Sequence, residues 1–160
     1  MKYLKIFILL FLAVTISVNS QAKIKKGTQK TSAEEIVRTL PPPPDGIFIH
    51  LSSGAENPLS VLAALTTALE MSADHEVYVY LDVNAVNVVV NNAKSIEMPK
   101  FEASKILIDK LIAKGAAVAV SQLCLEANNK TKFDLMKGIK IANLEDFLNF
   151  TRGRILSLSY

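Results

Sequence analysis

The sequence predicts an α/β fold, a three-layer sandwich in which helices cover both faces of a five-stranded, mainly parallel sheet. From position 47 onward, short runs of β-branched and aromatic residues alternate with longer segments of helical periodicity. Such alternation is typical of strand–helix–strand units, whose crossovers make neighbouring strands parallel. The run AAVAVS (116–121) is apolar at almost every position. This pattern indicates a strand buried on both faces, as parallel sheets require.

The first strand is predicted at IFIHL (47–51), and the small-residue loop SSGAEN follows it. A helix is predicted over 58–72, because Asn57 is a good N-cap and proline is favoured at the first helical position. EVYVYLDV (76–83) is rich in β-branched and aromatic residues and predicts the second strand. The next stretch, 84–98, contains four asparagines and is open between a strand-like and a short helical segment.

The second half of the chain continues the same alternation. Apolar residues share one stripe of a helix predicted over 101–115, which finishes with the terminating pair Lys114-Gly115. Strand three is then expected at 116–121 and a short strand four at GIKIA (138–142). NLEDFLNFTRG begins with an asparagine cap and predicts the last helix, and RILSLSY (154–160) predicts strand five.

The N-terminus has the pattern of a secretory signal peptide over residues 1–22. Lys2 and Lys5 precede a short apolar run, and Ser20-Gln21-Ala22 presents small residues at the two positions a signal peptidase reads. The run is shorter than the roughly 20 residues that span a bilayer, so we expect cleavage, no stable membrane span, and a periplasmic or secreted protein. An uncleaved anchor is the alternative.

Residues 23–45 read as a tether with a proline-rich end, ahead of one domain over 46–160. The four consecutive prolines favour an extended rod. The other interpretation is an arm that docks on the domain or on a neighbouring subunit. Removing residues 1–22 lowers the formal net charge from +3 to +1. A nearly neutral chain lacks the clustered basic charge of nucleic-acid binding proteins, so no nucleic-acid partner is expected.

Cys124 is the only cysteine, so it cannot form a disulfide within its own chain. It is a buried small side chain, an intermolecular partner or a reactive thiol. Ligands of parallel α/β sheets gather outside the carboxyl ends of the strands. Three segments are expected at that edge: 52–57, 82–92 and 122–129, the last of which contains Cys124. This placement weakens the interpretation of Cys124 as a simply buried side chain.

Two further groups of candidates lie near the same edge. Ser52, Ser53, Gly54 and Asn57 are candidate ligand-binding residues, because small residues before a helix expose N–H donors to an anion. A tight strand–helix turn with an asparagine cap is the commoner explanation of such residues. His50 is a candidate for tuning the thiol, although a histidine inside a strand is often structural. The spacing of two histidines and one cysteine makes no metal motif, and no cofactor is expected.

The succession of elements also resembles a known family. IHLSSGAENP, EVYVYLDV, AKGAAVAV, the cysteine of SQLCLEAN, DLMKGIKIANLEDFLNF and RILSLS follow one another as in the DsrE/DsrF-like sulfur-relay proteins, which include the TusBCD type. The resemblance covers about 46–159. It implies a DsrE-like sandwich, assembly as a trimer or hexamer, and a loop cysteine that carries sulfur as a persulfide. The matching position here is Cys124.

This chain departs from the family in two ways. Many relatives have a second cysteine just before the matching one, where this chain has Ser121 and Gln122, so no resolving thiol is present. Export also sets it apart from the cytoplasmic relay proteins of tRNA thiolation. Two hypotheses follow. The protein is an exported sulfur carrier with a sulfur donor and an acceptor protein as partners, or it is a non-catalytic oligomeric binding module of the envelope in which Cys124 is structural.

Overall fold

The computed structural model describes residues 42–160. The predicted signal peptide (1–22) and residues 23–41 of the predicted tether lie outside the described residues. Within 42–160, none of the helices has both the length and the apolar character needed to cross a membrane.

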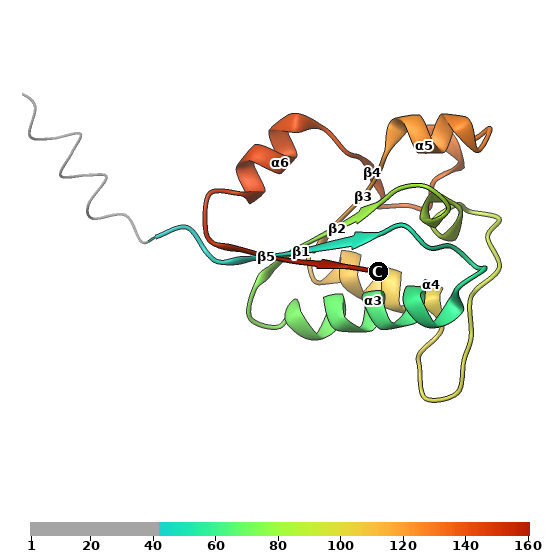
Figure 1. The fold of residues 1–160 in the computed structure, drawn as a ribbon, viewed down its shortest axis with the longest axis horizontal. Helices are drawn as coiled ribbons and strands as arrows, with labels where there is room; N and C mark the ends of the chain where they lie inside the picture. The colour runs from blue at the N-terminus through green and yellow to red at the C-terminus, as the bar shows by residue number, and fades with distance from the viewer. Residues whose placement is uncertain (1–41) are drawn as a thin grey trace, which may run out of the picture. The chain divides into compact units, whose positions relative to one another are not determined.

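The centre of the fold is a five-stranded parallel sheet with the order β4-β3-β2-β1-β5 (Figure 1). Its strands are β1 (Gly46–Leu51), β2 (Glu76–Leu81), β3 (Ala117–Val120), β4 (Lys140–Ile141) and β5 (Ile155–Ser159). All four strand pairs run parallel, so the predicted fold class is confirmed. The connection from β4 to β5 crosses the whole sheet, whereas each earlier connection leads to the adjacent strand.

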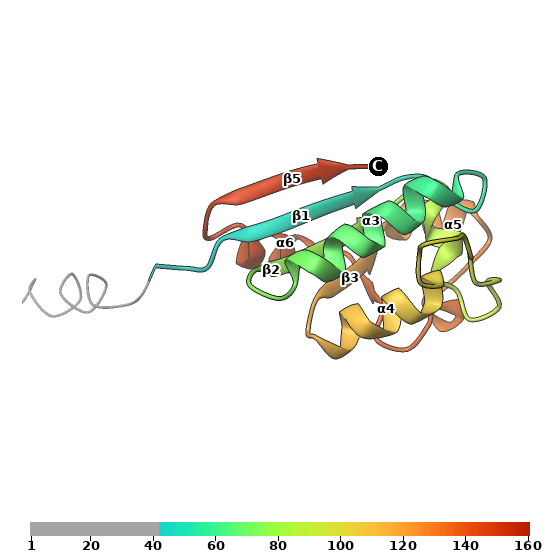
Figure 2. The same ribbon diagram turned by 90° about the horizontal axis from the view of Figure 1, so that it is seen from below.

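Helices lie on both sides of this sheet. The helical elements are α3 (Pro58–Met71), η1 (Ala85–Val88), α4 (Ser104–Ala113), α5 (Gln122–Ala127), η2 (Lys132–Asp134) and α6 (Leu144–Phe150). Helices α3 and α4 pack side by side below the sheet in Figure 1, and Figure 2 shows the same pair in front of it. Helix α6 lies on the opposite face, and α5 follows the end of β3 (Figure 1).

Alternating side chains of the strands build two cores. Ile47, Ile49 and Leu51 of β1, together with the alternate residues of β2 and β3, are buried in the larger core with α3 and α4. Burial of each such side chain contributes about 1.5–3 kcal/mol. The smaller core on the other face is aromatic: Phe48, Tyr78 and Tyr80 pack against Phe147 and Phe150 of α6.

Local signals account for most helix boundaries. The Asn57 side chain accepts the N–H of Ser60 and Pro58 is the first residue of α3, while Asn143 caps α6 through the N–H of Asp146. Gly115 ends the turn after α4 with φ +84, a conformation that glycine adopts without strain. The caps predicted at Asn57 and Asn143 are therefore confirmed.

The stretch left open, 84–98, is one turn of 3-10 helix followed by irregular chain. After η1, an isolated antiparallel bridge pairs Val90 with Leu135. The valines at 86 and 88–90 are buried in the larger core although they belong to no strand of the sheet. Their β-branched side chains give the segment its strand-like sequence pattern. In the structure these side chains pack in the core, and their backbone pairs with no strand of the sheet.

Candidate functional site

The carboxyl ends of the strands bring the three predicted edge segments into contact. The backbone N–H groups of Asn84 and Ala85 donate to the carbonyl of Ser52, at 3.2 and 3.3 Å. The side-chain amide of Asn87 donates to Asn128 at 2.8 Å, which joins η1 to the end of α5. The loops after β1, β2 and β3 therefore form one continuous edge, as the chain order predicts.

Cys124 lies on this edge as the third residue of α5. It is a free, half-buried cysteine that packs against the larger core. Its backbone is held at both ends: Ser121 Oγ accepts its N–H at 3.3 Å, and the side-chain amide of Asn128 donates to its carbonyl at 2.8 Å. The main chain of Cys124 is thus fixed, and the remaining freedom of the thiol is rotation about its side-chain bonds.

His50 is paired with a carboxylate instead of the thiol. His50 Nε2 lies 2.9 Å from Asp82 Oδ2, and the two side chains are 35% and 21% exposed. Among residues 42–160, no hydrogen bond joins His50 to Cys124. The other carboxylate oxygen of Asp82 is buried and has no partner within the same range. The geometry therefore supports a His–Asp pair beside the edge, which the sequence reasoning did not anticipate.

The register of the sheet explains this pair. His50 is aligned with Tyr80 on β2, and Asp82 follows two residues later on the same face. Residues two apart on a strand point the same way. The sequence contains both residues near the ends of predicted strands, but only the register of the two strands shows that His50 and Asp82 are neighbours.

The loop after β1 satisfies its own polar groups. Ser52 Oγ donates to the carbonyl of Tyr160 at 3.2 Å, and Ser53 Oγ accepts from the hydroxyl of Ser60 at 3.3 Å. The N–H of Gly54 donates to Glu56 Oε1 at 2.8 Å. That hydrogen bond is the largest of the interactions that lower the pKa of the Glu56 carboxyl below its ordinary value. Anion binding at this loop stays a prediction, and a ligand there would have to displace Glu56.

Two backbone features hold the edge in shape. A Cβ on Gly54 would lie 2.7 Å from the carbonyl oxygen of Asn84, so only glycine allows the two loops to approach this closely. Val83 adopts φ +46, which is unusual for a β-branched residue. Its carbonyl accepts a hydrogen bond from Asn128 at 3.3 Å, which ties the strained turn to α5.

Within residues 42–160, no group of three or more histidine, cysteine or acidic side chains is placed to hold a metal ion. The His50–Asp82 pair belongs to the second sheet face, while the thiol packs with the larger core.

No protein-family model and no curated protein matches the chain. Several solved structures resemble it, including the two that follow. The ychN protein from E. coli superposes with a TM-score of 0.58 at 17% identity, over 71% of this chain and 99% of that one. MTH1491, a protein of unknown function from Methanobacterium thermoautotrophicum, superposes with a TM-score of 0.54 at 13% identity, over 71% and 98%. The chain thus shares the parallel α/β fold of these two structures, and identities this low show the fold alone.

Proposed function

We propose that this protein is an exported sulfur carrier in which the Cys124 thiol accepts a sulfane sulfur and passes it to a partner protein. The observation that carries the proposal is the position of a free, half-buried cysteine on the helix directly after β3 of a DsrE-like fold. The family resemblance of the sequence puts the sulfur-carrying cysteine at this same point.

The reaction needs no second thiol. The Cys124 thiolate attacks the outer sulfur of a donor persulfide, R–S–SH, because the thiolate is the reactive form of cysteine. A new S–S bond forms on Cys124, the S–S bond of the donor breaks, and R–S⁻ leaves. Cys124 then carries the persulfide Cys–S–SH with no net oxidation. Since one thiol is enough, Ser121 can serve as the helix cap where relatives have a second cysteine.

Partial burial fits this chemistry in an oxidising compartment. A fully exposed persulfide or thiol is readily oxidised or captured in mixed disulfides. The contacts of Cys124 with the larger core limit such access, and they leave part of the residue at the surface for a donor and an acceptor.

The alternative is an oligomeric binding module of the envelope in which Cys124 only packs. It is supported by large apolar side chains that are exposed in the single chain: Leu123 is 79% exposed, Phe133 82%, Leu144 71% and Leu148 60%. Exposed apolar side chains mark interaction sites where they form a contiguous patch. We propose that these side chains contribute to a homotrimer or homohexamer. Light scattering of the purified protein measures the mass, and a monomer at micromolar concentration would contradict the assembly.

Intact-mass analysis tests the carrier. The processed protein is treated with a small-molecule persulfide, free thiols are alkylated, and a Cys124→Ala variant is treated in parallel. We expect one added sulfur atom on the native chain, removed by reductant, and none on the variant. A thiol that neither gains sulfur nor reacts with the alkylating agent until urea unfolds the protein would refute the carrier and favour the binding module.

Export is tested separately. We expect the protein isolated from its cells to begin at or near residue 23, in agreement with the small-x-small pattern at Ser20-Gln21-Ala22. N-terminal sequencing of this protein checks the prediction, and an intact Met1 would contradict it.

A further inference from the structure

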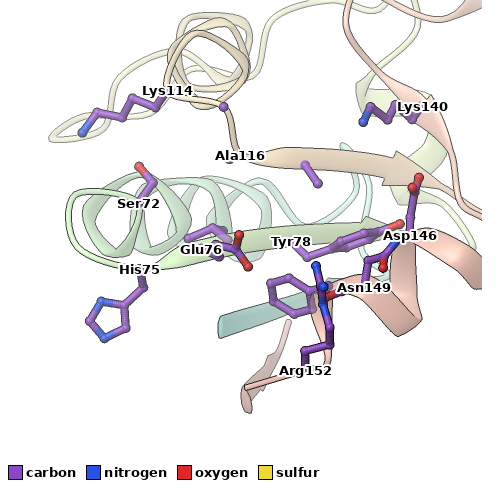
Figure 3. Close-up of a pocket in the computed structure, with 14 residues that line it drawn as sticks. Ser72, His75, Glu76, Tyr78, Lys114, Ala116, Lys140, Asp146, Asn149 and Arg152 are labelled. Atoms are coloured by element: carbon purple, nitrogen blue, oxygen red, sulfur yellow. The ribbon is translucent and has the colours of Figure 1, made fainter. Parts of the chain in front are cut away.

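A cavity lies at the amino edge of the sheet, opposite the edge that carries Cys124. Its volume is about 320 Å³, and its wall comes from the turn before β2, the starts of β3 and β4, and α6 with the turn that follows it (Figure 3). At about 30 Å³ for each water-sized group, this space holds roughly ten such groups. The cavity therefore has the size of a small metabolite.

Tyr78 lines this cavity, and its buried hydroxyl is a donor without a partner among residues 42–160. Tyr78 is only 2% exposed, and its hydroxyl has no hydrogen-bond partner among residues 42–160. Burial, followed by the negative charge of Asp146, raises the pKa of Tyr78 to about 12, so the hydroxyl keeps its proton at neutral pH. Buried hydroxyl groups in native proteins are nearly always paired. In this arrangement the phenol hydroxyl therefore has no acceptor among residues 42–160.

Three cationic side chains surround the same space: Lys114, Lys140 and Arg152. In the part of the chain that the structure describes, none of them has a carboxylate within 4 Å. Arg152 donates through Nε to the carbonyl of Asn149 at 3.1 Å. A guanidinium presents paired N–H donors that match a carboxylate. The cavity is therefore equipped for an anionic oxygen group.

Two acids limit the charge of the ligand. Glu76 and Asp146 also line the cavity, and Asp146 accepts from the side-chain amide of Asn143 at 2.9 Å. The two acids offset two of the three cations, so the lining carries a formal net charge of +1 and matches a monoanion better than a dianion such as phosphate. A single carboxylate that also carries a hydroxyl or amino group matches both kinds of side chain, because the acids accept from its donor.

We propose that this cavity binds a small 2-hydroxy or 2-amino monocarboxylate, whose carboxylate accepts from Tyr78 and pairs with Arg152. Figure 3 shows the tyrosine hydroxyl next to Asp146, which is half-buried. Because the hydroxyl is buried in this arrangement, a ligand reaches it only when the Asp146 side chain rotates away. The carboxylate of the ligand then takes the place of the Asp146 carboxylate beside the phenol. The site is independent of the role proposed for Cys124.

NMR titration of the processed protein tests the proposal, with L-lactate, L-glutamine and inorganic phosphate as probes. We expect saturable shifts at the starts of β2 and β3 with both carboxylates, and binding of phosphate at least tenfold weaker. Tyr78→Phe and Arg152→Gln should each weaken binding of the carboxylates about tenfold, which corresponds to one lost charge-assisted hydrogen bond. Lys132→Gln, an exposed substitution outside the cavity, should leave it unchanged.

The Tyr78→Phe variant also separates ligand binding from a structural role. Because the hydroxyl has no partner, removing it should leave the melting temperature of the ligand-free protein unchanged or slightly higher. A clear drop in melting temperature would mean that the hydroxyl is satisfied within the protein, and it would overturn the proposal. Failure of both carboxylates to bind, or equal binding by Tyr78→Phe and the native chain, would overturn it as well.

Discussion

Apart from the tyrosine Tyr78, Ser104 is the only polar residue among residues 42–160 that is fully buried, and removal of its hydroxyl should be costly. Its Oγ accepts the buried N–H of Ile96 at 2.9 Å, and its own N–H donates to the carbonyl of Ile96 at 3.0 Å. Ser104→Ala leaves the N–H of Ile96 without an acceptor in the core. An unsatisfied buried donor costs about 1–3 kcal/mol. We therefore expect the free energy of unfolding to fall by about 2 kcal/mol.

Urea unfolding measures this loss, and a neighbouring serine provides the control. With a slope of about 1–3 kcal/mol per molar urea, the midpoint should fall by roughly 1 M at an unchanged slope. Ser95→Ala removes a half-buried acceptor that lies 3.4 Å from the N–H of Lys105, so it should cost less than about 0.5 kcal/mol. If the two variants lose equal stability, water satisfies the N–H of Ile96 and the reasoning from burial is wrong.

Two further predictions concern the carboxyl edge. The pKa of Glu56 is lowered in the folded state, chiefly by the N–H of Gly54, so the carboxylate contributes stability above its ordinary pKa of 4.5 and loses it as the pH falls through the folded value. Glu56→Gln should therefore be less stable than the native chain at pH 7, and this difference in stability should shrink below pH 4.5. Thermal unfolding of both proteins across that pH range measures the trend. A difference that stays constant would contradict the prediction. Asn128→Ala removes several hydrogen bonds, among them one from Asn87 of η1 and one to the carbonyl of Cys124. Because α5 is then held less firmly, alkylation of Cys124 in the folded protein should be several-fold faster. An unchanged rate would show that packing alone holds α5.

The fold followed from the sequence because local pattern and global arrangement agree in most elements. Alternation in GIFIHL sends Ile47 and Ile49 to the larger core, and it sends Phe48 and His50 to the other face. Pattern alone misjudged boundaries where tertiary contacts decide. The helix predicted from 101 begins at Ser104, because Ala103 is extended and the pairing of Ser104 with Ile96 sets the start.

The second strand shows the same limit. It was predicted to reach position 83 and ends at Leu81, since Val83 turns the chain with φ +46. Valine has a high strand propensity, so the sequence pattern extends the strand to position 83. The tertiary contacts of this turn override that propensity. The carboxylate of Asp82 is then free to pair with His50.

The position of Cys124 was predictable because chain order alone assigns a residue to one edge of a parallel sheet. The amino-edge cavity was not, since its walls combine four segments of the chain without any common motif. Which face of the sheet lies under α6, and how far α6 covers it, depends on the crossing from β4 to β5. The periodicity of the sequence predicts neither the position of α6 nor the area of the sheet that it covers.

The two edges also constrain how the proposals relate to each other. Ala117 lines the cavity and Ser121 caps the helix of Cys124, so the four residues of β3 separate them. At about 3.3 Å per residue, that distance is roughly 13 Å. A ligand as small as lactate cannot reach across it, so the cavity cannot deliver a reactant to the thiol directly. Cys124→Ala should therefore bind lactate as the native chain does, and Tyr78→Phe should still accept sulfur. Loss of sulfur loading in Tyr78→Phe would mean that the sheet itself couples its two edges.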